Sequence, residues 1–178
     1  MSGMSSKRTS HPIVGTVAIV VTVSLLAASR VSAQGMPPGE SGAKAALEKS
    51  PRHGEYVDID VSGRDAPLRA YVVYPETKES APVVIVVHEI FGLTDWIRSV
   101  ADQLAAEGFI AIAPDYITGK GVEDGPDGPP REAAVAAIRA LSQEEVQGRT
   151  DAVARYGMAL PAAAQKYGIV GFCWGGST

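Results

Sequence analysis

The alternation of apolar and polar residues predicts regular secondary structure from about residue 55 onward. Residues 56–61 alternate as a half-buried strand should, a turn follows at residues 62–65, and residues 68–74 form a second apolar run. These two runs predict an antiparallel hairpin. Residues 83–87 (VVIVV) are a continuous β-branched stretch, which is typical of a strand buried on both faces of a parallel sheet.

A helix is predicted after this strand, because the segment has an apolar face and signals for both of its ends. Thr94 or Asp95 can cap its N-terminus, and Gly108 ends it. The apolar face consists of Ile97, Val100, Ala101 and Leu104. Residues 109–113 then form a second buried strand, so the chain is expected to contain a β-α-β unit with a right-handed crossover.

The second half of the chain continues the succession of helices and strands. Residues 116–130 are rich in Gly, Pro and Asp and predict a long surface loop, which is often functional when it follows a buried strand. Residues 131–141 and 143–160 are alanine-rich helical stretches, and residues 167–172 form the last apolar strand. This order of elements predicts an α/β protein.

The first 54 residues predict an export signal and a linker. Residues 1–33 have a positively charged start, an uncharged apolar run and small residues before a cleavage site at Gln34, which is the layout of a secretory signal peptide. An uncleaved membrane anchor is the alternative, but the run is shorter than the roughly 20 residues that a spanning helix needs. We therefore expect export to the periplasm or the extracellular space without membrane attachment after cleavage. A flexible lead-in over residues 34–54 and a folded domain over residues 55–178 should follow.

Composition and charge narrow the classes of function. The 178 residues carry a net charge of −4 with a pI near 5.4, so the chain lacks the basic surface that nucleic-acid binding requires. Its single cysteine can form neither an internal disulfide nor a zinc site of several cysteines. In an oxidising compartment an unpaired cysteine is a free thiol that requires an explanation.

The last predicted strand runs directly into the sequence GFCWGG (171–176). This sequence follows the nucleophile-elbow pattern G-x-S-x-G with Cys173 in the serine position. Small residues two before and two after the nucleophile let the backbone cross closely, and the turn should place the thiol at the N-terminus of a helix. There the helix dipole favours a thiolate, and the N–H of Trp174 can stabilise an oxyanion. The alternative is that Cys173 is a small buried apolar residue.

A second candidate feature is the segment HEIFG (88–92), which follows the strand of residues 83–87. Ligands of open α/β sheets bind beyond the carboxyl ends of the strands, so this segment and the elbow should line one crevice. The N–H of Ile90 is then the candidate for the second oxyanion donor. The carboxylate of Glu89 is costly beside a buried strand unless it is paired or used, although helix entry or solvation is the alternative. For His88, packing at the strand end is the favoured interpretation.

Two stretches together carry a resemblance to a known family, VVIVVHEIFGLTDWIRSVADQLAAEGFIAIAPD and GIVGFCWGG. Residues 56–176 resemble the dienelactone hydrolase family (carboxymethylenebutenolidases). The resemblance implies the N-terminal portion of an α/β-hydrolase fold and hydrolysis of a small lactone, such as a cyclic enol ester, or a similar ester, with no metal ion or organic cofactor. It implies Cys173 as the nucleophile and Glu89 as the carboxylate that hydrogen-bonds the resting thiol and helps to form the thiolate. Arg131 is the best match for an arginine that holds the substrate carboxylate, and a solvated arginine at a helix start is the alternative.

The sequence lacks the acid and the base that should follow the nucleophile in such a hydrolase. Residues 174–178 contain neither Asp nor His, and His11, His53 and His88 all precede Cys173. We therefore expect the chain to be an N-terminal fragment of a longer hydrolase, with little turnover of its own. The alternative is a non-catalytic exported binding or partner-dependent module that reuses the front half of the fold. The sequence leaves the oligomeric state open.

Overall fold

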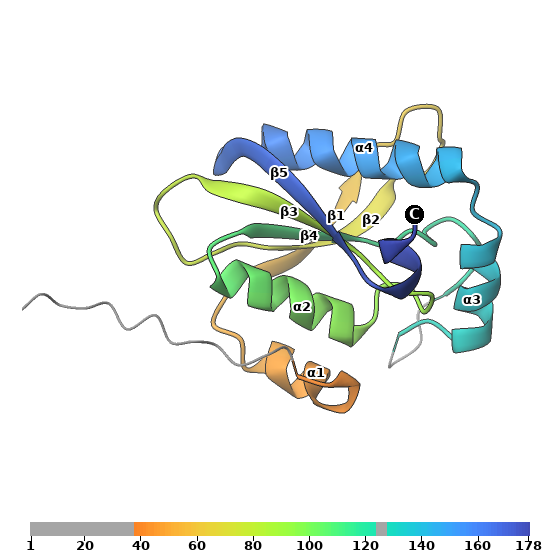
Figure 1. Cartoon of the computed structure of the whole chain (residues 1–178), viewed down its shortest axis with the longest axis horizontal. Coiled ribbons are helices and arrows are strands. Elements are labelled where there is room, and N and C mark those ends of the chain that lie inside the picture. The colour runs from red at the N-terminus through yellow and green to blue at the C-terminus, as the bar shows by residue number, and fades with distance from the viewer. Residues whose placement is uncertain (1–37, 124–127) are drawn as a thin grey trace, which may run out of the picture. The chain divides into compact units, whose positions relative to one another are not determined.

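Five strands form one mixed sheet in the computed structural model, which describes residues 38–123 and 128–178 (Figure 1). The strands are β1 (Gly54–Ile59), β2 (Leu68–Val73), β3 (Ala81–Val87), β4 (Ile110–Pro114) and β5 (Ala163–Gly171). Their order across the sheet is β1-β2-β4-β3-β5. β2 is antiparallel to both β1 and β4, whereas β3 is parallel to both β4 and β5. The structure therefore confirms the predicted hairpin, the parallel strands of the β-α-β unit and the α/β class.

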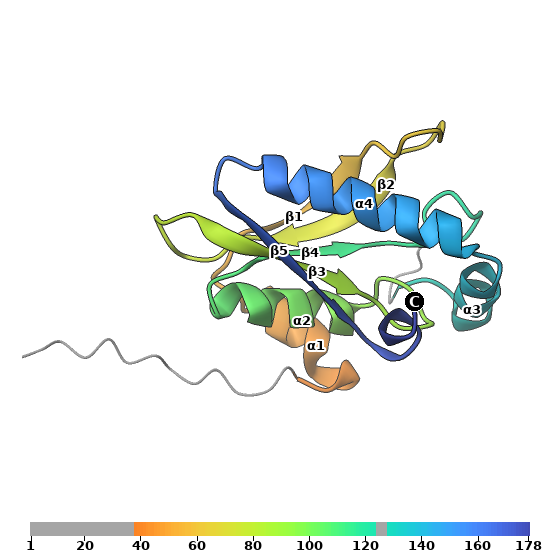
Figure 2. The ribbon, with the colours of Figure 1, turned by 45° about the horizontal axis from the view of Figure 1, so that its top comes forward.

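Helices cover both faces of this sheet (Figures 1 and 2). The helices are α1 (Glu40–Glu48), α2 (Asp95–Ala106), α3 (Arg131–Arg139) and α4 (Gln143–Ala159), and the short 3₁₀ helix η1 spans Cys173–Gly176. Thr94 caps α2, because its hydroxyl accepts a hydrogen bond from the Ile97 amide. Gly108 lies just beyond the end of α2 with a φ of +93°, as expected for a glycine that terminates a helix. The structure confirms the three helices that the sequence predicts.

The two faces of the sheet belong to two separate apolar cores. On one face, Val86 and Ala111 pack with the buried side of α2. On the other face, Ile85 and Ile112 pack with α3 and α4. α4 approaches the sheet so closely that a Cβ atom at Gly157 would lie 2.9 Å from side-chain atoms of Val83 and Ile112. Successive side chains of a strand point to opposite faces of the sheet. A short run of apolar residues can therefore pack against helices on both faces.

Helix α1 corrects the expectation of a flexible lead-in over residues 34–54. In the part of this segment that the structure describes, α1 packs on the outer side of α2 and buries Ala43 completely. Beyond its C-terminus, the guanidinium of Arg52 donates to both carboxylate oxygens of Asp102, at 3.0 Å and 2.6 Å. Sequence pattern missed the helix because its composition is small and charged, and its order comes from contacts with residues some 50 positions away.

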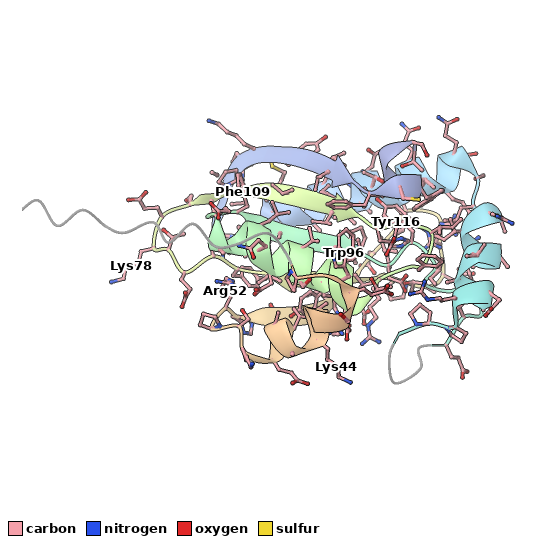
Figure 3. All side chains as sticks on the ribbon, turned by 60° about the horizontal axis from the view of Figure 1, so that its bottom comes forward. Lys44, Arg52, Lys78, Trp96, Phe109 and Tyr116 are labelled. Carbon is pink, nitrogen blue, oxygen red and sulfur yellow. The ribbon has the colours of Figure 1, made fainter. Side chains whose placement is uncertain are left out.

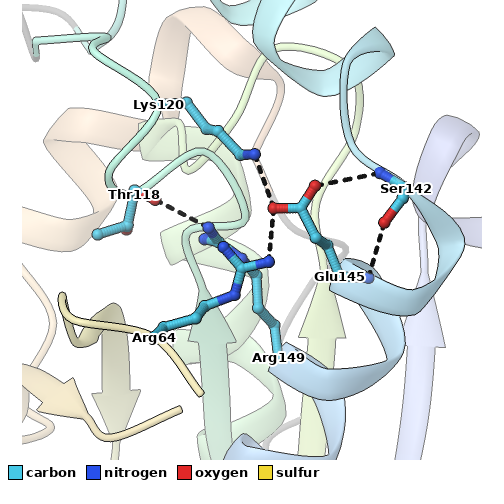
Figure 4. Close-up of polar contacts among 6 residues, drawn as sticks. All are labelled: Arg64, Thr118, Lys120, Ser142, Glu145 and Arg149. Atoms are coloured by element: carbon cyan, nitrogen blue, oxygen red, sulfur yellow. Dashed lines mark hydrogen bonds and ion pairs between the residues drawn. The ribbon is translucent and has the colours of Figure 1, made fainter. Parts of the chain in front are cut away.

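A group of ionic contacts attaches the loop after β4 to the start of α4 (Figure 4). Glu145 accepts hydrogen bonds from Lys120 Nζ at 2.7 Å and from Arg64 Nη2 at 2.6 Å. It also forms a capping box with Ser142 at the N-terminus of α4. The hydrogen bond from Lys120, followed by those from Arg64 and the Ser142 amide, lowers the pKa of Glu145 to about 2. The described part of the predicted surface loop is therefore held against the body of the fold.

Strand β5 is an edge strand of the described sheet, and its side chains are largely exposed. It begins four residues earlier than the pattern predicts and contains a bulge in its pairing with β3. Tyr167 and Ile169 are 52% and 54% exposed. The apolar run thus predicts the strand correctly, although helices cover it far less than they cover β3 and β4.

The predicted signal peptide over residues 1–33 lies outside the described residues. None of the helices in residues 38–123 and 128–178 combines the length and hydropathy that a membrane crossing requires.

Candidate active site

Cys173 lies at the turn between β5 and η1, with its thiol exposed to solvent. Its φ angle is +51°, in the left-handed region that a non-glycine residue rarely adopts. Such backbone strain persists only where the surrounding structure enforces it, and it occurs often at functional sites. The exposed position shows that the alternative interpretation of Cys173 as a buried apolar residue is wrong.

The two glycines that flank Cys173 explain how the fold enforces this turn. A Cβ atom at Gly171 would lie 2.0 Å from the carbonyl oxygen of Gly175. A Cβ atom at Gly175 would lie 2.6 Å and 2.7 Å from the carbonyl oxygens of Val87 and His88. Backbone segments therefore pass within contact distance of each other on both sides of the thiol. Only glycine fits at these two positions. This is the geometry that the G-x-C-x-G spacing predicts.

The element that follows the turn is shorter than the sequence pattern implies. The sequence leads us to expect Cys173 at the N-terminus of a helix, whereas η1 is a single turn of four residues.

The elbow packs directly against the end of β3. The amide of Phe172 donates to the Val87 carbonyl at 3.1 Å. The indole ring of Trp174 stacks on the His88 ring at 5.6 Å and meets the Tyr116 ring edge-on at 5.6 Å. The structure therefore brings the elbow and the segment at residues 88–92 to the same end of the sheet, as expected.

His88 is fully buried and is committed to structural hydrogen bonds. Its Nε2 atom accepts from the Tyr116 amide at 3.0 Å, which leaves the proton on Nδ1, where it is donated to the Glu89 carbonyl at 2.6 Å. Burial lowers the pKa of His88 to about 4, so the ring is neutral near pH 7. Because both ring nitrogens are occupied, the structure confirms the interpretation of His88 as a packed residue at the strand end.

Glu89 and Ile90 are half-buried just after β3. Burial raises the pKa of the Glu89 carboxyl, the charge of Glu40 raises it further, and the charge of Arg131 opposes this effect. Ile90 packs against the same apolar core as Trp174. Within the described residues, Glu89 forms no hydrogen bond with Cys173, so the structure does not display the resting contact that the resemblance implies.

Arg131, the first residue of α3, borders a separate pocket at this end of the fold. Its guanidinium carbon lies 4.4 Å from the centre of the Phe91 ring, and its Nη2 atom forms an ion pair with Glu40. The pocket has a volume of about 450 Å³, and we call it the Arg131 pocket. The residues that line it include Glu40, Lys44, Phe91, Thr94, Trp96 and Arg131.

The Arg131 pocket is linked to the nucleophile through aromatic packing. Trp96 lines the pocket and meets the ring of Phe172, the residue before Cys173, edge-on at 5.1 Å. In Figure 3, Lys44 points outward from α1. Glu40 is one of the members of this site that sequence reasoning missed. It lies in the segment expected to be flexible, and no local pattern relates it to Arg131, which is 91 positions away.

A larger cavity, of about 620 Å³, lies between α4, β5 and η1. Its lining includes Leu141, Val146, Ile169 and Trp174, but not Cys173, Glu89 or Arg131. Size alone therefore does not identify the site that carries the reactive groups. Within residues 38–123 and 128–178, the structure contains no group of three or more His, Cys, Asp or Glu side chains that could hold a metal ion.

Comparison with known proteins gives a consistent set of similarities. The sequence profile of the Dienelactone hydrolase family matches residues 68–178. The carboxymethylenebutenolidase of Pseudomonas putida is 30% identical over 122 residues, which are 67% of this chain and 52% of that protein. Carboxymethylenebutenolidase 1 of Cupriavidus pinatubonensis is 33% identical over 111 residues, which are 61% of this chain and 47% of that protein. The chain thus spans about half the length of the curated relatives it matches.

Solved structures show the same relationship. A protein of Klebsiella pneumoniae assigned as a dienelactone hydrolase is 29% identical, with a TM-score of 0.58, over 70% of this chain and 51% of that one. A dienelactone-hydrolase-like promiscuous phosphotriesterase from metagenomic libraries is 25% identical, with a TM-score of 0.56, over 71% of this chain and 51% of that one. The mixed sheet with helices on both faces is therefore that of the α/β-hydrolase fold.

Proposed function

Because the chain belongs to the dienelactone hydrolase family, we propose that it provides the nucleophilic part of a hydrolase that acts on small esters or lactones, with Cys173 as the nucleophile. The observation that carries this proposal is the geometry of Cys173. Its thiol is exposed, its φ angle is +51°, and two glycines at which no Cβ atom fits hold the turn. A turn of this kind presents a side chain to a substrate from a rigid backbone.

In the proposed reaction, the thiolate of Cys173 attacks the carbonyl carbon of the ester and forms a C–S bond. The carbonyl electrons move onto oxygen, and the backbone N–H groups of Trp174 and Ile90 stabilise the resulting oxyanion. When the oxyanion collapses, the ester C–O bond breaks, and the alkoxide leaves and takes up the proton that the thiol gave to Glu89. In a lactone, the same step opens the ring. Water then cleaves the thioester, releases the acid and returns the thiol.

We assign Glu89 the role of accepting the thiol proton when a substrate enters. Its pKa is already raised by burial and by the charge of Glu40, which favours proton uptake. We assign Arg131 the role of holding a carboxylate of the substrate. This role is supported by its place in a pocket that Trp96 connects with the residue before Cys173.

The step that releases the acid requires a base that neither described histidine offers. His88 uses both ring nitrogens in hydrogen bonds, and His53 stacks on Tyr74 beside strand β1. We therefore expect the 178-residue chain to form the thioester faster than it hydrolyses it.

The test is a reaction with 4-nitrophenyl acetate under single-turnover and multiple-turnover conditions. We expect a burst of about one equivalent of 4-nitrophenolate per chain, followed by slow turnover, because acylation precedes a slower hydrolysis. Peptide mass spectrometry should locate the acetyl group on Cys173. The Cys173→Ala variant should lose the burst.

The matched control is the same chain unfolded in urea, whose thiol reacts without the elbow. Folded protein should acetylate on the order of tenfold faster, since positioned oxyanion donors contribute at least that much. Equal rates for the folded and unfolded chain would contradict an activated nucleophile. They would instead favour a non-catalytic module built on the same fold.

A further inference from the structure

We propose that Glu40 determines how strongly the Arg131 pocket selects for anionic ligands. Its carboxylate pairs with the Arg131 guanidinium and therefore competes with the carboxylate of a ligand. The inference rests on the proposed role of Arg131 in holding a substrate carboxylate. It adds a residue of α1, outside the matched residues 68–178, to the specificity of the site.

The contact between Glu40 and Arg131 has the chemistry of the contact that a ligand would make. A guanidinium binds carboxylates through directed N–H donors, and Glu40 supplies such a carboxylate from within the chain. The guanidinium carbon of Arg131 also lies over the Phe91 ring, 4.4 Å from its centre. Glu40 therefore stands where the carboxylate of a ligand would stand.

The surroundings favour a small, flat, anionic ligand. Phe91 and Trp96 supply aromatic surface, while Arg131 supplies the guanidinium that a carboxylate can bind. The other carboxylate that lines the pocket, Asp95, forms an ion pair with Arg98. The volume of about 450 Å³ is in the range that small-molecule sites typically have.

The ion pair is suited to replacement because both partners face solvent. The side chains of Arg131 and Glu40 are 54% and 62% exposed, and exposed ion pairs are weak. A ligand carboxylate can therefore displace Glu40 by rotation of one side chain into water. The helix need not move, because Arg52 and Asp102, whose side chains are only 6% and 13% exposed, anchor the chain just beyond its other end.

The test measures binding of benzoate, with benzamide as the uncharged ligand of the same shape. Nuclear magnetic resonance titrations would follow the indole N–H of Trp96 and the side-chain Nε–H of Arg131. Glu40→Gln should tighten benzoate binding about two- to fivefold, the range that the loss of an exposed competing ion pair allows, and should leave benzamide binding unchanged. Glu48→Gln removes the same charge from the other end of α1 and is the matched control.

Four outcomes would overturn the proposal. The first is equal benzoate affinity in the wild type and in Glu40→Gln. The second is an equal gain in Glu48→Gln, which would indicate a general charge effect. The third is no benzoate binding by any variant, and the fourth is binding that Arg131→Gln leaves intact. None of these outcomes depends on thioester formation at Cys173, so this inference and the proposed function can fail separately.

Discussion

The elbow at residues 171–176 and the Arg131 pocket are neighbours that the chain builds in opposite ways. In the elbow, backbone atoms approach so closely that a Cβ atom at Gly171 would lie 2.0 Å from the Gly175 carbonyl. In the Arg131 pocket, two long side chains that are more than half exposed meet beside an aromatic ring. The elbow has no room for one added carbon atom, whereas the pocket can rearrange by side-chain rotation.

This difference separates two tasks that one site must perform. A nucleophile has to be held within a fraction of an ångström, which backbone crossings and a strained φ angle achieve at a cost in stability. Ligand selection needs contacts that can exchange with those of a ligand, and exposed ion pairs provide them at little cost. We therefore expect substitutions in the elbow to affect stability strongly and substitutions in the pocket to affect binding.

The largest expected effect is that of Gly171→Ala. The added methyl group would overlap with the Gly175 backbone, so the turn must open or shift, and we expect a loss of at least about 3 kcal/mol in the free energy of unfolding. Urea unfolding followed by the fluorescence of Trp96 and Trp174 measures this loss.

Gly168→Ala is the matched control, because it lies in the same strand and a Cβ atom there meets no atom within 4 Å. It should change the stability by less than about 0.5 kcal/mol. Equal effects at the two positions would mean that the backbone crossing at the elbow does not constrain the fold.

An effect of at most about the size expected for Gly171→Ala, and one that depends on pH, is expected from His88, whose ring stacks on Trp174 of the elbow. The folded state keeps His88 neutral down to a pKa of about 4, whereas the unfolded chain takes up a proton near the ordinary value of 6.5. The free energy of unfolding should therefore fall as the pH falls from 6.5 to 4, by about 3 kcal/mol from this residue alone, and His88 should contribute no further change below pH 4.

His88→Gln isolates this contribution, because an amide does not titrate while its oxygen can still accept from the Tyr116 amide. The variant should show a shallower loss of stability between pH 6.5 and pH 4 than the wild type. His53→Gln, at a histidine whose side chain is 68% exposed, is the matched control. If His88→Gln and the wild type lose stability in parallel, His88 is not held neutral by burial.

The same contrast explains how far the sequence alone predicts this protein. The sequence predicts those features that neighbouring residues determine. Examples are the apolar runs of β3 and β4, the Thr94 cap and the glycines around Cys173. Prediction from local sequence fails where a structure is held by residues that are far away in the chain. Arg52, beyond the end of α1, pairs with Asp102, and Glu40 meets Arg131 across 91 positions, so neither contact leaves a periodic signal.

The order of apolar and polar residues also does not predict how exposed β5 is. Its apolar residues predict a strand but not what covers it, and Tyr167 and Ile169 are more than half exposed at the edge of the described sheet. The hydrogen bond between Glu89 and Cys173, which the resemblance implies and the described residues do not form, illustrates a further limit. Proximity at one end of the sheet follows from topology, whereas a hydrogen bond depends on rotamers that no sequence motif specifies.

The smallest expected effect on stability is that of Glu40→Gln, and it provides the sharpest contrast with the elbow. Because the ion pair with Arg131 is exposed on both sides, its loss should change the free energy of unfolding by less than about 0.5 kcal/mol, indistinguishable from Glu48→Gln in the same urea titration. A loss of about 2 kcal/mol would instead mean that Glu40 fastens α1 to the fold, and that a ligand could not displace it by rotation of a side chain. A near-zero change in stability together with a measurable gain in benzoate affinity would show that the residue contributes to selection and not to folding.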